Sequence, residues 1–280
     1  MSLRIVTDST CDLPAETLAR YGIRVVPLYI NVGRNGYRDG IDLTREAFYR
    51  GLPTFPVHPT TAAPSAHTFR EVYESLAAEG ATAVLSIHIA AALSGVVDVA
   101  RSAAREVTAL PVTVLDSQQL SLGTGFLVET AAQLAAIGRP LNDILAVLAD
   151  QIRRTHVFAA LDTLEFLRRS GRLNGFLAGI GALLQLKPLL TMFAGTPSTE
   201  RVRTRRRATR RLIDLLRAVG PLERVALVHT AAPERVAELR AESRTLLPTG
   251  DLLAVDITPV IGAHIGPGAV GFAVVGSPKP

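Results

Sequence analysis

Short apolar runs alternate with amphipathic stretches along most of the chain. In the first half, apolar runs at 3–7, 83–87 and 112–115 are each followed by a stretch with helical periodicity. Strands that are spaced by helical patterns of roughly 10 to 15 residues indicate a parallel sheet covered by helices. The pattern therefore predicts an α/β fold for this half. Its helices are expected at 14–21, 65–80, 95–107, 119–137 and 141–154.

Residues 25–65 interrupt this alternation. Strands at 25–31 and 37–39 are expected to form a hairpin with its turn in G-R-N-G at 33–36. Asn35-Gly36 is the signal for this turn, because the dipeptide favours the backbone of tight hairpin turns. A helix is expected at 44–51. The segment 53–65 contains four prolines, which favour a loop over a regular element.

The second half mixes strands and helices in an α+β pattern. We place the domain boundary near residue 153, which gives an N-terminal parallel-sheet α/β domain at 1–153 and a C-terminal α+β domain at 154–280. Strands are expected at 156–161, 189–193, 224–229, 252–257 and 270–275, and helices at 163–169, 204–219 and 233–246. Because ligands of parallel sheets bind beyond the carboxyl ends of the strands, the polar loops at 8–9, 86–94 and 116–117 are expected to face one crevice.

One glycine-rich stretch frames a histidine. Residues 260–268 read V-I-G-A-H-I-G-P-G and are expected to form a loop, since glycine permits φ > 0 and close approach, and Pro267 stiffens the chain. A histidine that must present one ring nitrogen to a ligand needs such a fixed frame. His264 is therefore a candidate ligand-binding residue. The alternative is a hairpin corner in which His264 bonds to a neighbouring carbonyl.

Composition narrows the class of protein. Of 280 residues, 48% are hydrophobic, which is ample for a buried core. The best candidate for a membrane span, 176–186, is shorter than the roughly 18 residues required and contains glycine, so no integral membrane association is expected. No signal peptide is apparent. Cys11 is the single cysteine, which excludes an intramolecular disulfide and indicates a cytoplasmic location.

The formal net charge of +5 is concentrated in one place, where seven arginines fall within eleven positions. These are Arg201, Arg203, Arg205, Arg206, Arg207, Arg210 and Arg211. No recognisable nucleic-acid-binding module accompanies them and only 5% of residues are aromatic, so nucleic acid is not the expected partner. A solvated helix face and a docking surface for an acidic partner or phosphate both remain open.

The common signatures of nucleotide, serine-hydrolase and metal sites are absent from the sequence. It has no P-loop, no dinucleotide-binding glycine motif, no nucleophile elbow and no two histidines at helical spacing. We therefore expect neither a cofactor nor a metal.

What remains is a set of hydroxyls and cations beside loops and helices. Ser94 immediately precedes the helix that is predicted to begin at Gly95. The free N–H groups at the start of that helix would favour an anion beside the serine hydroxyl. A serine at this position is equally consistent with a plain N-cap. Thr61 either reaches a ligand or merely stabilises the proline-rich turn. Arg172 and Arg203 are candidate phosphate ligands, but the sequence alone favours surface charges.

Six segments in order give the chain a resemblance to a known family. They are T-D-S-T-C-D-L-P at 7–14, T-A-A-P-S at 61–65, L-S-G at 93–95, D-S-Q-Q-L-S-L-G at 116–123, L-E-F-L-R-R-S-G-R-L at 164–173 and V-I-G-A-H-I-G-P-G at 260–268. Each is weak by itself, but together they are specific. The chain resembles the DegV family, of the FakB type of fatty-acid-binding protein, over nearly its whole length. Ala62 and Ala63 stand where that family usually has Ser-Gln.

The resemblance implies a two-domain protein that buries a long-chain fatty acid between its domains. Thr61, Ser94 and His264 match the residues that hold the carboxylate, with Gly95 beside them. Such proteins are not enzymes by themselves: they present the acid to a separate fatty acid kinase, which makes an acyl phosphate for phospholipid synthesis. Arg172 and Arg203 match arginines of the phosphorylation step or kinase contact. The apolar segment 176–186 is our candidate for much of the tunnel wall.

Two other functions are consistent with the sequence. The first is an acyl- or phosphoryl-transfer enzyme in which His264 is the acid-base catalyst, supported by Asp8 or Asp116. The second is a regulatory protein that acts through the Arg201–Arg211 cluster.

Overall fold

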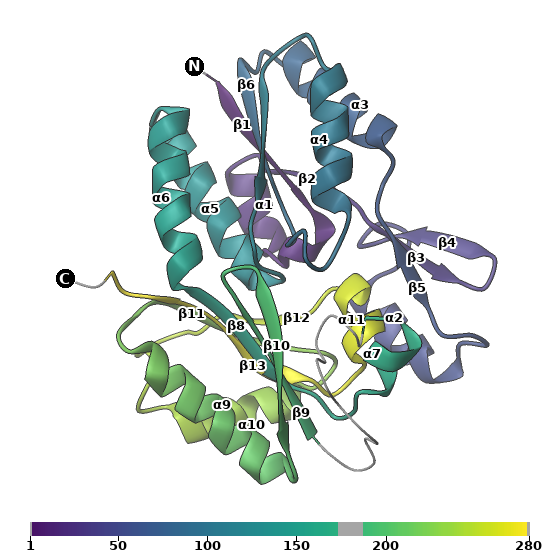
Figure 1. Cartoon of the computed structure of the whole chain (residues 1–280), viewed down its shortest axis with the longest axis vertical. Coiled ribbons are helices and arrows are strands. Elements are labelled where there is room, and N and C mark those ends of the chain that lie inside the picture. Colours follow the sequence, from purple (N-terminus) through teal and green to yellow (C-terminus); the bar gives the residue numbers. More distant parts are fainter. Residues whose placement is uncertain (1, 173–186, 279–280) are drawn as a thin grey trace.

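The computed structural model describes residues 2–172 and 187–278, which form an α/β structure with three sheets (Figure 1). The first half of the chain builds a four-stranded parallel sheet, and the second half builds a six-stranded mixed sheet. A three-stranded antiparallel sheet lies beside them. The predicted α/β fold is confirmed. No helix in the described part of the chain is long and apolar enough to cross a membrane.

Helices cover both faces of the parallel sheet. Its strands are ordered β2 (Arg24–Val26), β1 (Leu3–Asp8), β6 (Ala83–His88) and β7 (Val112–Asp116). Because successive side chains of a strand point to opposite faces, Val6 packs toward α3 and α4, whereas its neighbour Ile5 packs toward α5 and α6. The helices are α3 (Ala66–Ala78), α4 (Val96–Glu106), α5 (Leu122–Ala136) and α6 (Leu141–Arg154).

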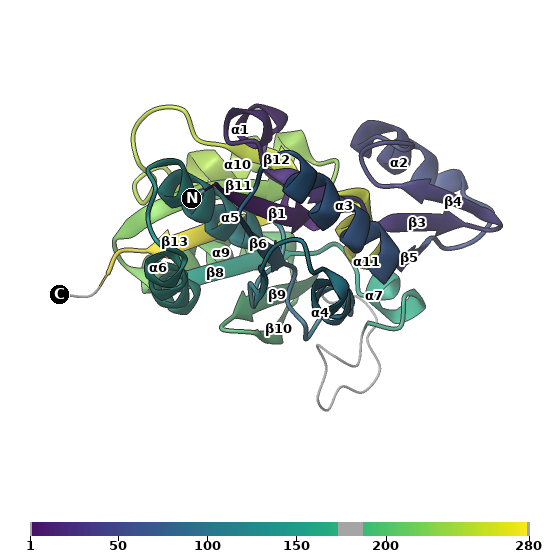
Figure 2. The same cartoon turned by 90° about the horizontal axis from the view of Figure 1, so that it is seen from above.

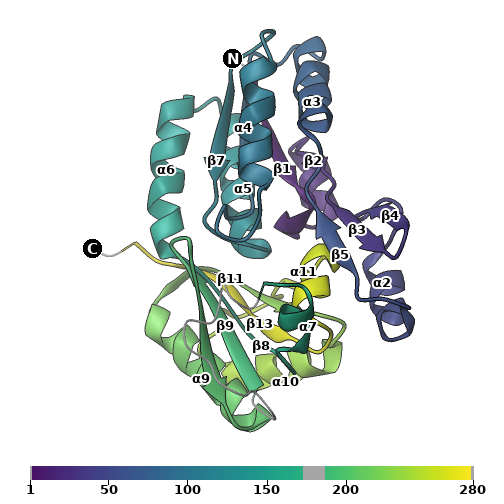
Figure 3. The same ribbon diagram turned by 45° about the vertical axis from the view of Figure 1, so that its right-hand side comes forward.

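The mixed sheet is covered on one face by its own helices and on the other by the N-terminal half. Its order is β10 (Thr196–Val202), β9 (Lys187–Phe193), β8 (Thr155–Ala160), β13 (Val270–Gly276), β11 (Leu222–His229) and β12 (Ala254–Asp256). Helices α9 (Arg205–Val219) and α10 (Pro233–Ser243) lie on the face away from the parallel sheet (Figure 3). On the opposite face, Val157 and Ala159 share a core with Leu127 and Ile144. One continuous core therefore joins the two halves.

The remaining elements surround the junction between the halves. They are η1 (Ser9–Cys11), α1 (Ala15–Arg20), β3 (Tyr29–Val32), β4 (Asn35–Arg38), α2 (Arg45–Gly51), η2 (Leu52–Thr54), β5 (Thr60–Ala62), α7 (Glu165–Arg169) and α11 (Pro259–Ile265). Figure 2 shows α2 and the small sheet at one end of the molecule, next to α11. Helix α6 runs directly into β8, and the division into domains 1–153 and 154–280 stays a prediction.

The predicted hairpin forms, and its turn lies in the first half of the predicted turn 33–36 and not at its signal, Asn35-Gly36. Val32 pairs with Asn35, so Gly33-Arg34 make the turn, with Gly33 at φ +63°. The predicted strand 25–31 is also two strands, since β2 joins the parallel sheet and β3 the small sheet. Pro27, which lacks an N–H donor, lies at the break between them.

Two segments predicted as loops are regular elements. In the proline-rich segment, residues 60–62 form β5, which pairs with β3; Pro59 and Pro64 lie outside the strand and remove none of its hydrogen bonds. The stretch 260–265 is helical, because Pro259 suits a first helical position and Gly266, at φ +74°, ends the helix.

One strand was not predicted from the sequence, and one predicted segment lies outside the described residues. Strand β10 was not expected, because its sequence T-P-S-T-E-R-V lacks an apolar alternation; it pairs with β9 at the edge of the sheet. The candidate tunnel wall at 176–186 lies outside the described residues.

Candidate ligand-binding site

A cavity of about 150 Å³ lies where α11 meets β5 and the loop between β6 and α4. We call it the head cavity. Its lining includes five residues singled out from the sequence, and aliphatic side chains such as Leu93 and Ile261 supply most of the rest. The five are Thr61, Ser94, Gly95, Arg172 and His264. The fold thus brings together residues from distant parts of the chain.

His264 and Thr61 contact each other directly in the wall of this cavity. The ring Nε2 of His264 is 2.9 Å from Oγ1 of Thr61, although the two residues are 203 positions apart in the sequence. Helix α11 can lie close to α2 because a Cβ at Gly262 would overlap the Tyr49 hydroxyl. That hydroxyl donates a hydrogen bond to the carbonyl of Ile257 at 2.8 Å. The glycine in this helix therefore serves close packing.

The environment of His264 keeps its ring neutral. Burial, followed by the positive charge of Arg172 and by repulsion from His58, lowers the pKa of His264 to about 4. A neutral imidazole has one donor and one acceptor nitrogen. Nδ1 is buried and has no hydrogen-bond partner among residues 2–172 and 187–278. When Nε2 accepts from the Thr61 hydroxyl, Nδ1 carries the proton, so the ring retains a donor for a further group.

Ser94 and Gly95 bring the start of α4 to the head cavity. Gly95 is the N-cap residue and no side chain caps this helix, so Ser94 is not the plain cap that its sequence position allowed. The N–H groups of the first helical turn keep their partial positive charge. A hydroxyl and a helix N-terminus at the same cavity suit an anionic group.

The arginines of the candidate list lie in different places. Arg172 is exposed at the head cavity, close enough to affect the pKa of His264. Arg203 is exposed between β10 and α9 and is not among the described residues that line this cavity. The structure therefore places Arg172, but not Arg203, beside Thr61, Ser94 and His264.

Five arginines of the cluster, Arg205, Arg206, Arg207, Arg210 and Arg211, lie on α9, whose opposite face is buried, whereas Arg201 lies in β10 and Arg203 in the connection between the two elements. Arg205 pairs with Asp162 at 2.9 Å and Arg211 with Glu200 at 2.6 Å. Arg206, Arg207 and Arg210 are exposed. The interpretation as a solvated helix face fits this placement, and positive charge remains available at the surface.

A second cavity, of about 50 Å³, adjoins the head cavity through shared walls at Leu120, Ile261 and Ile265. We call it the tail cavity. Its surface is almost wholly apolar, and it extends along β8 and β9 past Ala159 and Met192. The sequence analysis did not identify it. The only available signal was the alternation in β8 and β9, which also describes an ordinary core strand.

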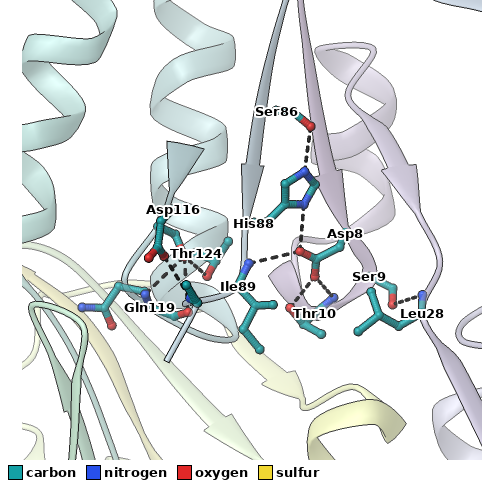
Figure 4. Close-up of polar contacts among 12 residues, drawn as sticks. Asp8, Ser9, Thr10, Leu28, Ser86, His88, Ile89, Asp116, Gln119 and Thr124 are labelled. Atoms are coloured by element: carbon teal, nitrogen blue, oxygen red, sulfur yellow. Dashed lines mark hydrogen bonds and ion pairs between the residues drawn. The ribbon is translucent and has the colours of Figure 1, made fainter. Parts of the chain in front are cut away.

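The polar loops at the ends of β1, β6 and β7 lie side by side (Figure 4). Of the predicted polar segments 8–9, 86–94 and 116–117, only 86–94 is among the described segments that line the head cavity, so the predicted common crevice is not what forms. The charged groups of the loops bond to one another and to the backbone. Asp8 accepts hydrogen bonds from Thr10, from His88 Nδ1 at 3.0 Å and from the N–H of Ile89 at 3.1 Å. His88 Nε2 is 2.7 Å from Ser86 Oγ. All of these side chains except Ile89 are fully buried and do not line the head cavity. The network therefore fixes the loops.

This arrangement leaves His264 without the acid-base partners that the alternative enzyme function requires. Asp8 is bonded to His88, and Asp116 accepts from the N–H groups of Gln118 at 2.8 Å and Ala91 at 3.3 Å. Neither carboxylate contacts His264, so the enzyme with Asp8 or Asp116 in support is not the arrangement that forms. Within the described chain, no group of three or more His, Cys, Asp or Glu side chains is placed to hold a metal ion.

Comparisons with known proteins agree over the whole chain. A family model described as "uncharacterised protein, DegV family" matches residues 2–277. A DegV domain-containing protein of Streptomyces coelicolor is 36% identical over 275 residues, with 96% of this chain and 97% of that protein covered. One from Deinococcus radiodurans is 37% identical over 281 residues, with 98% of each chain covered.

Two solved structures are similar in both sequence and fold. A DegV family protein from Thermus thermophilus, described as binding fatty acid, is 38% identical, with a TM-score of 0.90 and coverage of 99% of this chain and 100% of that one. DegV from Bacillus subtilis, described as a fatty acid binding protein, is 30% identical, with a TM-score of 0.91 and the same coverage.

Proposed function

This chain belongs to the DegV family, and we propose that it binds a long-chain fatty acid across the head and tail cavities. The observation that carries this proposal is the division of the site. Hydroxyls, an imidazole and a helix N-terminus gather in the head cavity, whereas the adjoining tail cavity is lined by apolar atoms. One acid group on a hydrocarbon tail fits this division, and a sugar or nucleotide, with polar groups throughout, does not.

The carboxylate is proposed to lie among Thr61, Ser94, Gly95 and His264. A buried carboxylate needs hydrogen-bond donors to offset its lost hydration. The Ser94 hydroxyl and the first N–H groups of α4 supply them, together with one proton of the Thr61–His264 pair, because one of these two groups donates to the other and only the second proton remains for the ligand. Arg172, exposed at the same cavity, adds an attractive charge.

The hydrocarbon tail supplies most of the affinity. About fourteen methylenes at about 0.8 kcal/mol each give on the order of 11 kcal/mol, against an association cost of at least about 4 kcal/mol. An apolar cavity of about 150 Å³ holds a benzene-sized molecule, and the two cavities have about 150 and 50 Å³. The apolar walls therefore have to separate when a long chain enters.

The bound acid is proposed to be presented to a separate fatty acid kinase in the cytoplasm. A non-enzymatic carrier is consistent with a His264 that lacks a carboxylate partner among the described residues. Arg172 at the head cavity and Arg203 on the exposed surface are the proposed groups for phosphorylation or kinase contact. The exposed arginines of α9 offer a surface for an acidic partner.

The first test identifies the ligand. The purified protein is denatured, the extract is analysed for acyl chains by mass spectrometry, and binding of palmitate to the delipidated protein is measured by calorimetry. We expect a long-chain acid in the extract or saturable binding on addition. An extract without acyl chains, together with no binding of added acids, would overturn the proposal.

The second test locates the carboxylate. Thr61→Val, Ser94→Ala and His264→Ala are each expected to weaken binding about tenfold to a hundredfold, because a hydrogen bond to a charged group contributes about 1.5–3 kcal/mol. His67→Ala is the matched control, since this exposed histidine pairs with Glu71 on α3 and does not line the cavity. Unchanged affinity in all three site variants would place the carboxylate elsewhere.

A further inference from the structure

Asp12 joins three separate segments of the chain through one buried carboxylate. Its side chain is fully buried. Oδ1 accepts hydrogen bonds from the backbone N–H of Thr258 and from Arg45 Nη2, both at 2.9 Å, and Oδ2 accepts one from the Ser121 hydroxyl at 2.6 Å. Asp12 follows η1, Arg45 begins α2 and Ser121 precedes α5, whereas Thr258 belongs to the C-terminal half.

Thr258 is the residue from which α11 begins. Its own side chain does not cap the helix but donates to the carboxylate of Asp39. The preceding carbonyl, of Ile257, accepts from Tyr49. Residues of the N-terminal half therefore hold the start of this helix by several hydrogen bonds. Among the described residues, Asp12 is the only group that accepts a hydrogen bond from the backbone N–H of Thr258.

A fixed start matters because α11 has only seven residues and carries His264 near its other end. At about 1.5 Å of rise per residue, His264 lies about 9 Å along the axis from Thr258. A tilt of about 10° at the start would move the ring by about 1.5 Å. That displacement would break its 2.9 Å contact with Thr61.

We propose that Asp12 is a positioning residue for acid binding: its carboxylate fixes the backbone N–H of Thr258, the N-cap residue of α11, and thereby holds His264 against Thr61. The proposal rests on the proposed function, since it assigns to Asp12 an effect on the affinity for a fatty acid. Asp12 itself is not among the described residues that line the head cavity.

The cost of keeping this group supports a functional reason for it. Burial raises the pKa of Asp12 to about 7, and the negative charge of Asp39 raises it further. The charge of Arg45 and the hydrogen bonds from Ser121 and Thr258 lower this pKa but do not offset the effect of burial. A buried carboxyl group with a raised pKa is more stable in its neutral form than in its ionised form. Its ionisation near neutral pH therefore destabilises the native state. Such groups occur preferentially where a site needs them.

The test is a double-mutant cycle on palmitate affinity. Asp12→Ala is expected to weaken binding at least tenfold in the otherwise native protein but by less than twofold in a His264→Ala background, because the ring that it positions is then absent. Asp12→Asn should restore affinity to within about threefold, since asparagine tolerates the observed φ of +55° and can accept the Thr258 N–H. An equal loss in both backgrounds, or no loss in either, overturns the positioning role.

A second pair of variants tests the same contact without altering Asp12. Thr258 has φ −52°, which proline adopts, so Thr258→Pro removes the N–H donor while keeping the backbone angle. Thr258→Val is its matched control, because it loses the hydroxyl but keeps the N–H. We expect Thr258→Pro to weaken palmitate binding at least fivefold more than Thr258→Val does. Equal affinities of the two variants would contradict the proposal even if Asp12→Ala fails to fold.

The two proposals fail in different ways. If the native protein binds no fatty acid, the proposed function is wrong and the cycle has no starting affinity. If the native protein binds palmitate and His264→Ala weakens that binding, but Asp12→Ala and Thr258→Pro do not, only the positioning role is wrong.

Discussion

Replacing Ala159 by leucine tests whether the tail cavity holds an acyl chain. Ala159 lies in β8, is 8% exposed and lines that cavity. Leucine adds the volume of about three methylenes, which a bound chain would otherwise occupy. At about 0.8 kcal/mol per buried methylene, palmitate loses about 2.4 kcal/mol. That loss corresponds to a roughly fiftyfold weaker affinity.

The assay is a calorimetric titration with saturated acids of increasing length. Octanoate, if it ends within the head cavity, should bind the variant and the native protein within about twofold, and the difference should grow with chain length. Ala160→Val is the control, because Ala160 faces α9 on the other side of the sheet and should change stability without a dependence on chain length. An equal loss for octanoate and palmitate, or none for either, would refute a tail in this cavity.

Three further predictions concern titration and packing. In an NMR titration of the acid-free protein, the His264 ring should protonate with a midpoint near 4, and a bound carboxylate should raise this midpoint because opposite charges favour the protonated ring. The pKa of Asp12, about 7, lies above its ordinary value of 3.8. Between these two pH values the folded chain therefore binds more protons than the unfolded chain does. The free energy of unfolding is expected to fall as the pH rises from about 4 to 7, by up to about 4 kcal/mol. Urea denaturation across this range should show a smaller fall in Asp12→Asn, and the same fall in both proteins would contradict the assignment. Gly262→Ala should destabilise the fold by about 1–3 kcal/mol through overlap with the Tyr49 hydroxyl; the cost should shrink in a Tyr49→Phe background, and an unchanged cost would argue against this contact.

The errors of the sequence analysis have local causes. The segment around Thr61 was expected to be a loop because of its prolines, yet the pairing of Thr61 with Ile30 makes it a strand. Such pairing depends on a distant partner, which local composition does not describe. The glycines around His264 likewise indicated a loop. Gly262 instead provides close contact with α2, and only Gly266 ends the helix.

The sequence by itself determined the α/β class, most of the helices and the family, because periodicity and local motifs are properties of neighbouring residues. It also supplied Thr61, Ser94, Gly95, Arg172 and His264 as candidates. The tertiary structure decided which of them meet, where the apolar tail cavity lies, and how the buried ring of His264 and the carboxyl of Asp12 acquire their pKa values of about 4 and 7. These properties arise from burial and from contacts between residues as far as 203 and 246 positions apart, and no local pattern in a sequence contains such distances.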